Sequence, residues 1–235
     1  MSITRTERVE CACGAPLELF LADSLNAGRH PHLKQAVLDR ALHVFRCDVC
    51  SEVLVIEKDM LFFDFERKQF FCVYPRQERA HEAACSQHVK RAYELWLGER
   101  APGFIAALGK QFLVRVCFGY EELREKLVID DAGLSDLVIE ALKIDLLVSD
   151  PWFEQASVVT LRLDAVLLDG SLQFLPEWID QIPDDVQPRV VTVSRALYAA
   201  VDDRFDDILV VHPGLAAGAH VSLLRLVSWP ELAIA

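Results

Sequence analysis

The chain has 235 residues, of which 52% are hydrophobic and 26% charged, and its formal net charge is −12 at pH 7. A chain of this length can bury one substantial core or two modest ones. No apolar run approaches the roughly 18 residues of a membrane-spanning helix, and the polar start Met1-Ser-Ile-Thr-Arg-Thr6 has no apolar leader. We therefore predict a cytoplasmic protein that does not bind membranes.

The negative charge is concentrated in the second half of the chain. Residues 1–100 contain 14 Lys and Arg against 15 Asp and Glu, whereas residues 101–235 contain 10 against 21. Because Lys and Arg contacts with phosphate supply most non-specific affinity for nucleic acid, this distribution argues against nucleic-acid binding. One local group of basic residues is interpreted as the solvated face of a helix: Arg76, Arg79, Lys90, Arg91 and Arg100.

Hydrophobic periodicity predicts both strands and helices in the first hundred residues. They are a strand at Pro16–Leu21, a helix at His32–Leu42, and strands at Val53–Glu57, Leu61–Phe65 and Gln69–Tyr74. The polar turn Glu66-Arg-Lys68 lies between the last two strands, so the last three are expected to form an antiparallel meander. A helix at 77–97 follows, with Cys85 and Val89 in its apolar stripe. The sequence Pro102-Gly103 then marks a boundary.

The second half is again predicted to mix helices and strands. The elements are a strand at Phe112–Phe118, helices at Glu121–Leu127 and Leu134–Leu147, a strand at Val158–Leu163, a hairpin at Ala165–Phe174, a helix at Ser194–Asp203 and a strand at Val221–Val227. We therefore predict an α+β fold. Residues 1–100 would form a zinc-ribbon-like antiparallel unit with a closing helix, and residues 101–235 an acidic α+β half packed on it.

Four cysteines form two closely spaced pairs near the N-terminus: Cys11 and Cys13, and Cys47 and Cys50. Two short cysteine turns from separate hairpins commonly supply the four thiolates of a tetrahedral zinc site. The 33 residues between the pairs do not exclude such a site, because doubling the length of a loop costs only about 0.6 kcal/mol. Zinc-finger peptides bind zinc with roughly 10–16 kcal/mol of apparent free energy. The pattern therefore predicts a structural zinc ion.

Other roles for these thiols are a disulfide, a redox-active Cys-x-x-Cys, and a site that has lost its metal. The predicted reducing cytosol favours metal binding over disulfides. A thioredoxin-like motif would lie between a strand and a helix, whereas Cys50 precedes the strand-like sequence Val53-Leu-Val-Ile56.

Several segments together resemble the CpXC domain family of bacteria and archaea. The resemblance covers residues 9–150, and its motifs are Cys13-Gly14, Asn26, Pro31-His-Leu-Lys34, Phe45-Arg-Cys-Asp-Val-Cys50, Leu61-Phe-Phe-Asp64, Gln69-Phe-Phe-Cys-Val-Tyr-Pro75, Glu125-Lys126 and Gly133–Lys143. It implies that the two cysteine motifs form one metal site, in a family without a characterised function. The chain departs from the family's usual Cys-Pro-x-Cys form, because Cys11-Ala-Cys13 is one residue shorter and Cys47-Asp-Val-Cys50 lacks proline.

A second set of candidate ligands lies on the helix predicted at 77–97. His81, Cys85 and His88 fall near one helical face, where a zinc hydrolase would place its ligands, with Glu82 as general base. Cys85 also continues the apolar stripe of the helix. The alternative interpretation is therefore a buried structural cysteine beside two surface histidines.

Acidic residues offer a third candidate site. Asp130, Asp131, Asp136 and Glu140 could form a metal site or an acid–base pair, since Asp136 and Glu140 are one helical turn apart. The structural interpretation is that Asp136 lies in the first turn of a helix, while Glu140 pairs with Lys143 or Lys126. A carboxylate on so apolar a helix needs a partner.

The sequence has no nucleophile, phosphate-loop or dinucleotide motif. We predict a protein-interaction or regulatory module, stabilised by a structural zinc ion, whose partner is another protein. The alternatives are a metal-dependent hydrolase or nuclease that uses His81, Glu82 and His88 or Asp136 and Glu140, and a nucleic-acid-binding zinc ribbon.

Overall fold

The computed structural model describes residues 2–178, 182–183 and 186–226. The chain divides into two compact units, residues 1–124 and 125–235, and the boundary falls within helix α4 (Tyr120–Asp131). The predicted α+β class is confirmed, since each unit combines helices with β-sheet. Along the described part of the chain, none of the helices combines the length and apolarity needed to cross a membrane.

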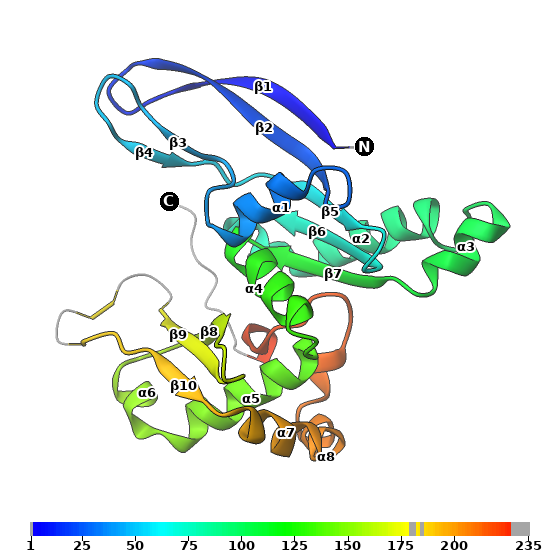
Figure 1. Ribbon diagram of the computed structural model, residues 1–235, viewed down its shortest axis with the longest axis vertical. Coiled ribbons are helices and arrows are strands. Elements are labelled where there is room, and N and C mark those ends of the chain that lie inside the picture. The colour runs from blue at the N-terminus through cyan, green and yellow to red at the C-terminus, as the bar shows by residue number, and fades with distance from the viewer. Residues whose placement is uncertain (1, 179–181, 184–185, 227–235) are drawn as a thin grey trace. The chain divides into compact units, whose positions relative to one another are not determined.

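The first unit is built on a five-stranded mixed sheet with the order β1-β2-β5-β6-β7 (Figure 1). Its strands are β1 (Ile3–Glu10), β2 (Pro16–Asn26), β5 (Met60–Asp64), β6 (Gln69–Tyr74) and β7 (Leu113–Phe118). The β1–β2 and β5–β6 pairs are antiparallel, whereas β2–β5 and β6–β7 are parallel. The parallel pairing of β2 with β5 covers only Ser24–Asn26. Most of the long β1–β2 hairpin therefore extends beyond the rest of the sheet.

Two shorter strands, β3 (Val44–Arg46) and β4 (Val53–Val55), form a separate antiparallel hairpin. The predicted antiparallel meander is therefore wrong in its first member. The strand near Val53 pairs with β3, with Phe45 opposite Leu54, and not with β5. Sequence analysis did not predict β3, because it has only three residues and two of them are exposed.

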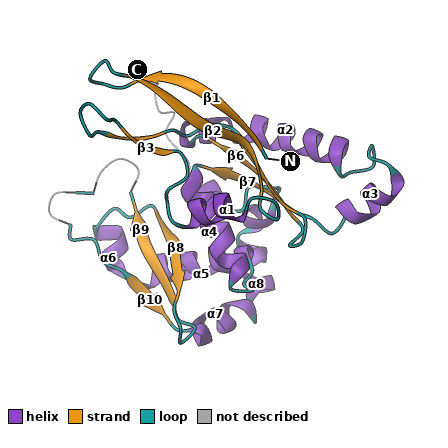
Figure 2. Ribbon diagram, turned by 45° about the horizontal axis from the view of Figure 1, so that its top comes forward, coloured by secondary structure: helices purple, strands orange, loops and turns teal. Residues whose placement is uncertain are grey.

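Helices cover parts of both faces of this sheet (Figure 2). Phe62 of β5 and Phe71 of β6 stack on one face of the sheet, and both rings are fully buried; helix α1 (Pro31–Leu38) contacts β2. On the other face, Phe70 meets Tyr93 of α2 (Glu82–Trp96). The helix predicted at 77–97 begins as a 3-10 turn, η1 (Arg76–His81), and short helix α3 (Gly103–Gly109) follows α2.

His43 anchors the start of the β3–β4 hairpin. Its Nε2 accepts a hydrogen bond from the Ala22 N–H (2.8 Å), and its Nδ1 lies 2.6 Å from the Tyr120 hydroxyl. Since Nε2 is an acceptor, the proton of the neutral ring is on Nδ1. Burial lowers the pKa of His43 to about 4, so the ring is neutral at pH 7 and keeps both contacts.

The second unit combines a three-stranded antiparallel sheet, in the order β10-β9-β8, with helices. Its core is formed by fully buried side chains such as Ile139, Leu142, Leu163 and Phe174. The elements are α5 (Asp136–Ser149), α6 (Pro151–Gln155), β8 (Thr160–Val166), β9 (Leu172–Glu177), β10 (Val191–Val193), α7 (Arg195–Asp202), α8 (Phe205–Val211) and two 3-10 turns, η2 (Pro213–Ala216) and η3 (Leu223–Leu226).

A network of charged side chains is buried within this unit. Lys143 Nζ lies 2.9 Å from Glu125 Oε1 and 2.7 Å from Glu140 Oε1. Lys126 Nζ lies 3.8 Å from Glu140 Oε1, and Arg162 Nη1 lies 3.5 Å from Glu125 Oε2. None of the five residues is more than 7% exposed. The prediction that Glu140 pairs with a lysine is confirmed, and it pairs with both candidates.

The same network explains why the strand predicted at Val221–Val227 is wrong. Among the described residues of this segment, Leu223–Leu226 form the 3-10 turn η3, while Val227 lies outside the described part. The Val221 carbonyl accepts a hydrogen bond from Lys126 Nζ (2.7 Å), and the Leu223 N–H donates to Glu140 Oε2 (2.8 Å). Buried side chains thus form hydrogen bonds with backbone groups that, in a strand, would bond to a neighbouring strand.

Candidate metal centre

The first cysteine pair lies in the turn between β1 and β2. The Cys11 N–H donates to the Ala15 carbonyl (2.9 Å), and the Gly14 N–H donates to the Cys11 carbonyl (2.8 Å). Gly14 has a φ of +84°, a left-handed conformation that favours glycine. This turn therefore needs only one residue between Cys11 and Cys13 to place both side chains at the tip of the hairpin.

The second pair lies between β3 and β4. The Cys47 N–H donates to the Glu52 carbonyl, and the Ser51 N–H donates to the Cys47 carbonyl, both at 2.8 Å. The backbone N–H groups of Cys50 and Val49 also donate to the Cys47 sulfur. These bonds form a tight turn without the proline of the usual family motif.

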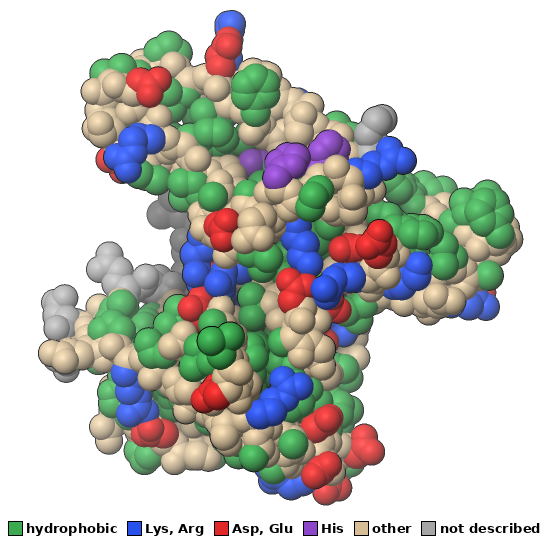
Figure 3. Space-filling view, viewed as in Figure 1, with side chains coloured by type: hydrophobic (Ala, Val, Ile, Leu, Met, Phe, Trp, Pro, Cys, Tyr) green, Lys and Arg blue, Asp and Glu red, His purple; other side chains and the backbone are tan. Residues whose placement is uncertain are grey.

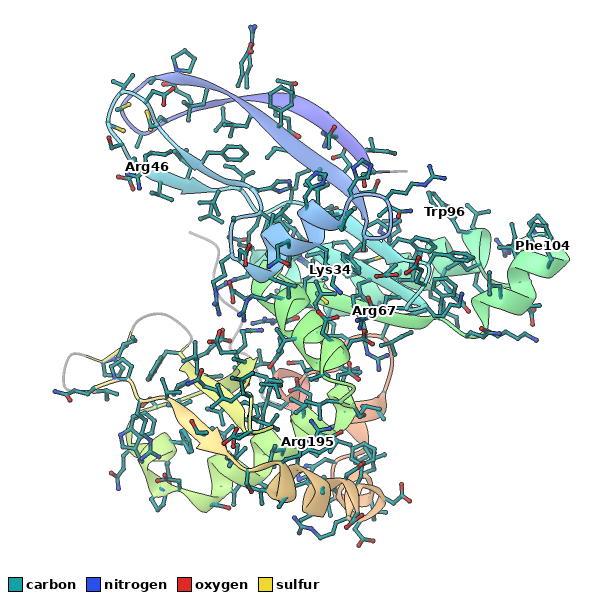
Figure 4. All side chains as sticks on the ribbon, viewed as in Figure 1. Lys34, Arg46, Arg67, Trp96, Phe104 and Arg195 are labelled. Carbon is teal, nitrogen blue, oxygen red and sulfur yellow. The ribbon has the colours of Figure 1, made fainter. Side chains whose placement is uncertain are left out.

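The two tips bring all four sulfur atoms together, although 33 residues separate the pairs in the sequence. The Sγ atoms of Cys11 and Cys50 are 3.6 Å apart, those of Cys13 and Cys47 are 3.8 Å apart, and all four lie within 4.8 Å of one another. Figure 4 shows sulfur atoms grouped at the ends of these hairpins. All seven cysteines are free thiols, so no disulfide accounts for the grouping.

These distances fit a tetrahedral metal ion. Zinc–sulfur bonds of about 2.3 Å place the sulfur atoms of a tetrahedral site about 3.8 Å from one another. Cys11 and Cys47 are buried, whereas Cys13 and Cys50 are exposed. The group is therefore compatible with a metal site near the surface of the first unit.

The thiols do not titrate alike. Hydrogen bonds from the backbone N–H groups of Cys50 and Val49 lower the pKa of Cys47 to about 7. The Glu52 N–H favours the Cys50 thiolate, but hydrogen bonding with Cys13, burial, and the other thiols raise the pKa of Cys50 to about 12. Four neighbouring thiolates need a cation to balance their charge, so metal binding would release protons.

Comparison with known proteins agrees with this geometry. A model of the CpXC protein family matches residues 9–143, which is more than half of the chain. The chain belongs to the CpXC family. No curated protein and no solved structure is found to match it. The matched region of the CpXC protein contains both cysteine hairpins and extends through Lys143 of the buried charged network.

The predicted histidine cluster of this CpXC protein does not assemble. His81 Nδ1 lies 3.1 Å from Glu78 Oε2, and His88 Nδ1 lies 2.9 Å from the Tyr74 hydroxyl. Cys85 is buried, as its place in the apolar stripe predicted. In the described ranges, the four-cysteine group is the one cluster of three or more metal-ligating side chains. The structure therefore gives no support for a zinc hydrolase site on α2.

The acidic residues are also engaged elsewhere. Asp136 begins α5 and lies 3.1 Å from Lys126 Nζ, and both side chains are buried. Glu140, one turn later, is held by Lys126 and Lys143. Asp130 and Asp131 are at the end of α4. Asp136 and Glu140 thus have lysine partners, and the structural interpretation is confirmed for the first-turn position of Asp136 and the pairing of Glu140.

Sequence reasoning missed β1, the strand that leads to the first cysteine pair. Its sequence, Ile3-Thr-Arg-Thr-Glu-Arg-Val-Glu10, is mostly polar on both faces. Six of its eight residues are exposed, and Glu7 and Val9 are half-buried. A strand with no buried face gives little periodic signal. The pairing of Val9 with Leu17 across the cysteine turn is the one local indication.

Proposed function

We propose that Cys11, Cys13, Cys47 and Cys50 bind one structural zinc ion and that the protein acts as an intracellular interaction or regulatory module. The observation that carries the metal assignment is the convergence of four sulfur atoms at tetrahedral distances. Four thiolates complete the usual coordination of zinc and leave no position for water or substrate, as in structural sites. The ion would therefore hold the two hairpins together and take no part in catalysis.

The β3–β4 hairpin needs such support. Each of its strands has three residues, and a two-stranded hairpin is at best marginally stable in water. Its valines, Val44, Val53 and Val55, are exposed, so burial of apolar surface contributes little. A bond from its tip to the β1–β2 hairpin would supply the missing free energy.

The interaction role is supported by large apolar side chains exposed on the first unit. Phe20 is 72% exposed, Trp96 59% and Phe104 78%. Figure 3 shows hydrophobic side chains gathered around α3, which carries Phe104. Aromatic residues are enriched in protein–protein contacts. The near-neutral charge of residues 1–100 favours a protein over nucleic acid as the partner.

The metal assignment predicts about one zinc ion per chain in protein purified without chelator. We expect the ion to be absent from the Cys47→Ser/Cys50→Ser variant, because half of the ligand set is removed. Elemental analysis by mass spectrometry measures this directly. The matched control, Cys72→Ser/Cys85→Ser, also removes two thiols and should retain the zinc. Zinc that persists in the first variant, or purified protein that contains iron instead, would overturn the assignment.

The interaction role predicts a specific protein partner whose binding depends on the exposed aromatic residues. In affinity purification from the source cells, the partner should be retained by the wild-type protein and lost with Trp96→Ser/Phe104→Ser. The loss should be at least about tenfold, since hot-spot aromatic residues contribute about 2 kcal/mol or more. Leu168→Ser is the control, because Leu168 is also an exposed apolar side chain but lies in the second unit. If no protein shows this difference, the interaction proposal is wrong.

A further inference from the structure

The first unit contains an open groove of about 810 Å³ between α2 and the sheet. Helix α2 contacts β6 and β7, and residues of the neighbouring strands β5 and β2 line the rest of the groove. The wall of the groove is formed by α2 residues from His88 to Trp96, a length of about 12 Å at the helical rise. The volume lies within the range of small-molecule sites, which is roughly 300–1,000 Å³.

Two rows of side chains form the floor of the groove. Leu61 lies opposite Cys72 in one row, and Phe63 lies opposite Phe70 in the next. Leu61, Phe63 and Cys72 remain partly exposed although they belong to central strands. An apolar floor that stays open to solvent is typical of a binding groove.

The two ends of the groove differ in chemistry. At one end, Phe70 meets Tyr93 of α2, and Leu95 and Trp96 form an apolar rim in which Trp96 is 59% exposed. Trp96 lies at the C-terminal end of α2 (Figure 4). At the other end, Tyr74 is hydrogen-bonded to His88. The groove is therefore apolar at one end and polar at the other.

Three charged side chains line the groove, and one of them, Asp23, is already paired with Lys58 and Arg5, which leaves Asp59 and Arg91. Asp59 directly precedes Met60, whose partner is Val73, so it lies beside Tyr74 at the polar end. Arg91 lies one helical turn from His88 toward the apolar end, about 4.5 Å along the axis. Among the residues that the structure describes, neither Asp59 nor Arg91 forms a hydrogen bond or an ion pair. From the apolar end, the order along the groove is thus apolar, positive, negative.

We propose that this groove binds a single-chain zwitterionic phospholipid as a monomer. The acyl chain would lie over Leu61 and Phe63 toward Trp96. The phosphate, next along the molecule, would meet Arg91, and the terminal amine would meet Asp59. This ligand carries its charges in the order complementary to the groove, and it satisfies both unpaired side chains. The site is separate from the cysteine group, so the proposal does not depend on the metal.

The order of charges gives the first test, with dodecylphosphocholine below its micelle concentration as the probe. Titration calorimetry should show binding to the wild-type protein at least about threefold tighter than that of dodecyl sulfobetaine, whose two charges are in the reverse order. Arg91→Gln should weaken binding by roughly three- to fivefold, the scale of an exposed ion pair. Lys90→Gln is the matched control, because it removes the same charge from α2 outside the groove. Equal binding of the two probes would overturn the proposal.

A charge reversal provides an independent test of orientation. The double variant Asp59→Lys/Arg91→Glu should prefer dodecyl sulfobetaine over dodecylphosphocholine. Retention of the wild-type preference in this variant would show that the two residues do not position the headgroup. Binding to phosphatidylcholine vesicles without binding of the monomeric probe would show that the protein binds a membrane surface, and it would overturn the proposal of a monomeric ligand.

Filling the groove tests its occupant. Ala92→Trp, on the wall of the groove, should reduce dodecylphosphocholine binding by more than about tenfold, because the indole ring would occupy the space in which the acyl chain is buried. Ala84→Trp, at an exposed position of α2 outside the groove, should bind normally.

Sedimentation of the same proteins tests the rival occupant, a second copy of the chain. A dimer of the wild-type protein that only Ala92→Trp abolishes would assign the groove to a second copy of the chain and overturn the lipid proposal.

Discussion

Replacement of Lys143 by Met should lower the free energy of unfolding of the second unit by about 3 kcal/mol, because removing one member of a buried ion pair leaves an uncompensated charge. Lys143 lies within 3 Å of both Glu125 and Glu140, and the methylene part of Met fills nearly the same volume. Urea unfolding followed by tryptophan fluorescence measures the change, since Trp152 and Trp178 belong to this unit.

Two further variants separate charge from packing in that experiment. Lys90→Met removes an exposed lysine of the first unit and should change stability by less than about 0.5 kcal/mol. The double variant Lys143→Met/Glu140→Gln removes a charge of each sign and should recover part of the loss. If Lys143→Met proves as stable as the wild-type protein, the network does not hold its charges in the way the contacts indicate.

Loss of the proposed zinc ion should unfold the β3–β4 hairpin and the tip of β1–β2 while the rest of the sheet stays folded. Hydrogen exchange of the zinc-depleted protein, or of Cys47→Ser/Cys50→Ser, should accelerate at least about 100-fold at the amides of residues 44–55. This factor corresponds to about 2.7 kcal/mol, well below the affinity of structural zinc. Peptides from β6 should be unchanged, because Phe70 and Phe71 are buried independently of the cysteines.

The control for this loss is Cys72→Ser/Cys85→Ser, which should show wild-type exchange at residues 44–55. The second unit provides an internal reference in every sample, since the four cysteines belong to the first unit. Exchange that stays slow at residues 44–55 after zinc is removed would show that the hairpin is stable without the ion.

Local patterns of the sequence predicted much of the fold. The strand predicted at Gln69–Tyr74 has those bounds in the structure, because its side chains are buried on both faces and form a continuous apolar run. Ser194, predicted to begin a helix, caps α7 by accepting a hydrogen bond from the Leu197 N–H. The convergence of the four cysteines was predicted from spacing and turn chemistry alone, since metal ligands need little else.

What sequence patterns could not predict depends on contacts between distant segments. The segment after Val221 is apolar and resembles a strand, yet side chains from α4 and α5 bond its backbone. The groove lies beside α2, which contacts β6 and β7, and residues of β5 and β2 line the rest of it. Hydrophobic periodicity does not predict where a helix packs across a sheet. Sequence analysis could therefore not predict that Asp59 and Arg91 line the same groove.

The buried network also determines where the chain can be shortened. The family match ends at Lys143, inside α5 and among the charged residues that later segments neutralise. A chain ending there would retain Glu125 and Lys126 but lose Arg162 and the Val221 carbonyl, their partners from β8 and the segment before η3. The limits of the family match and the limits of a foldable fragment therefore differ, and a fragment for expression should end within α4 or include the whole second unit.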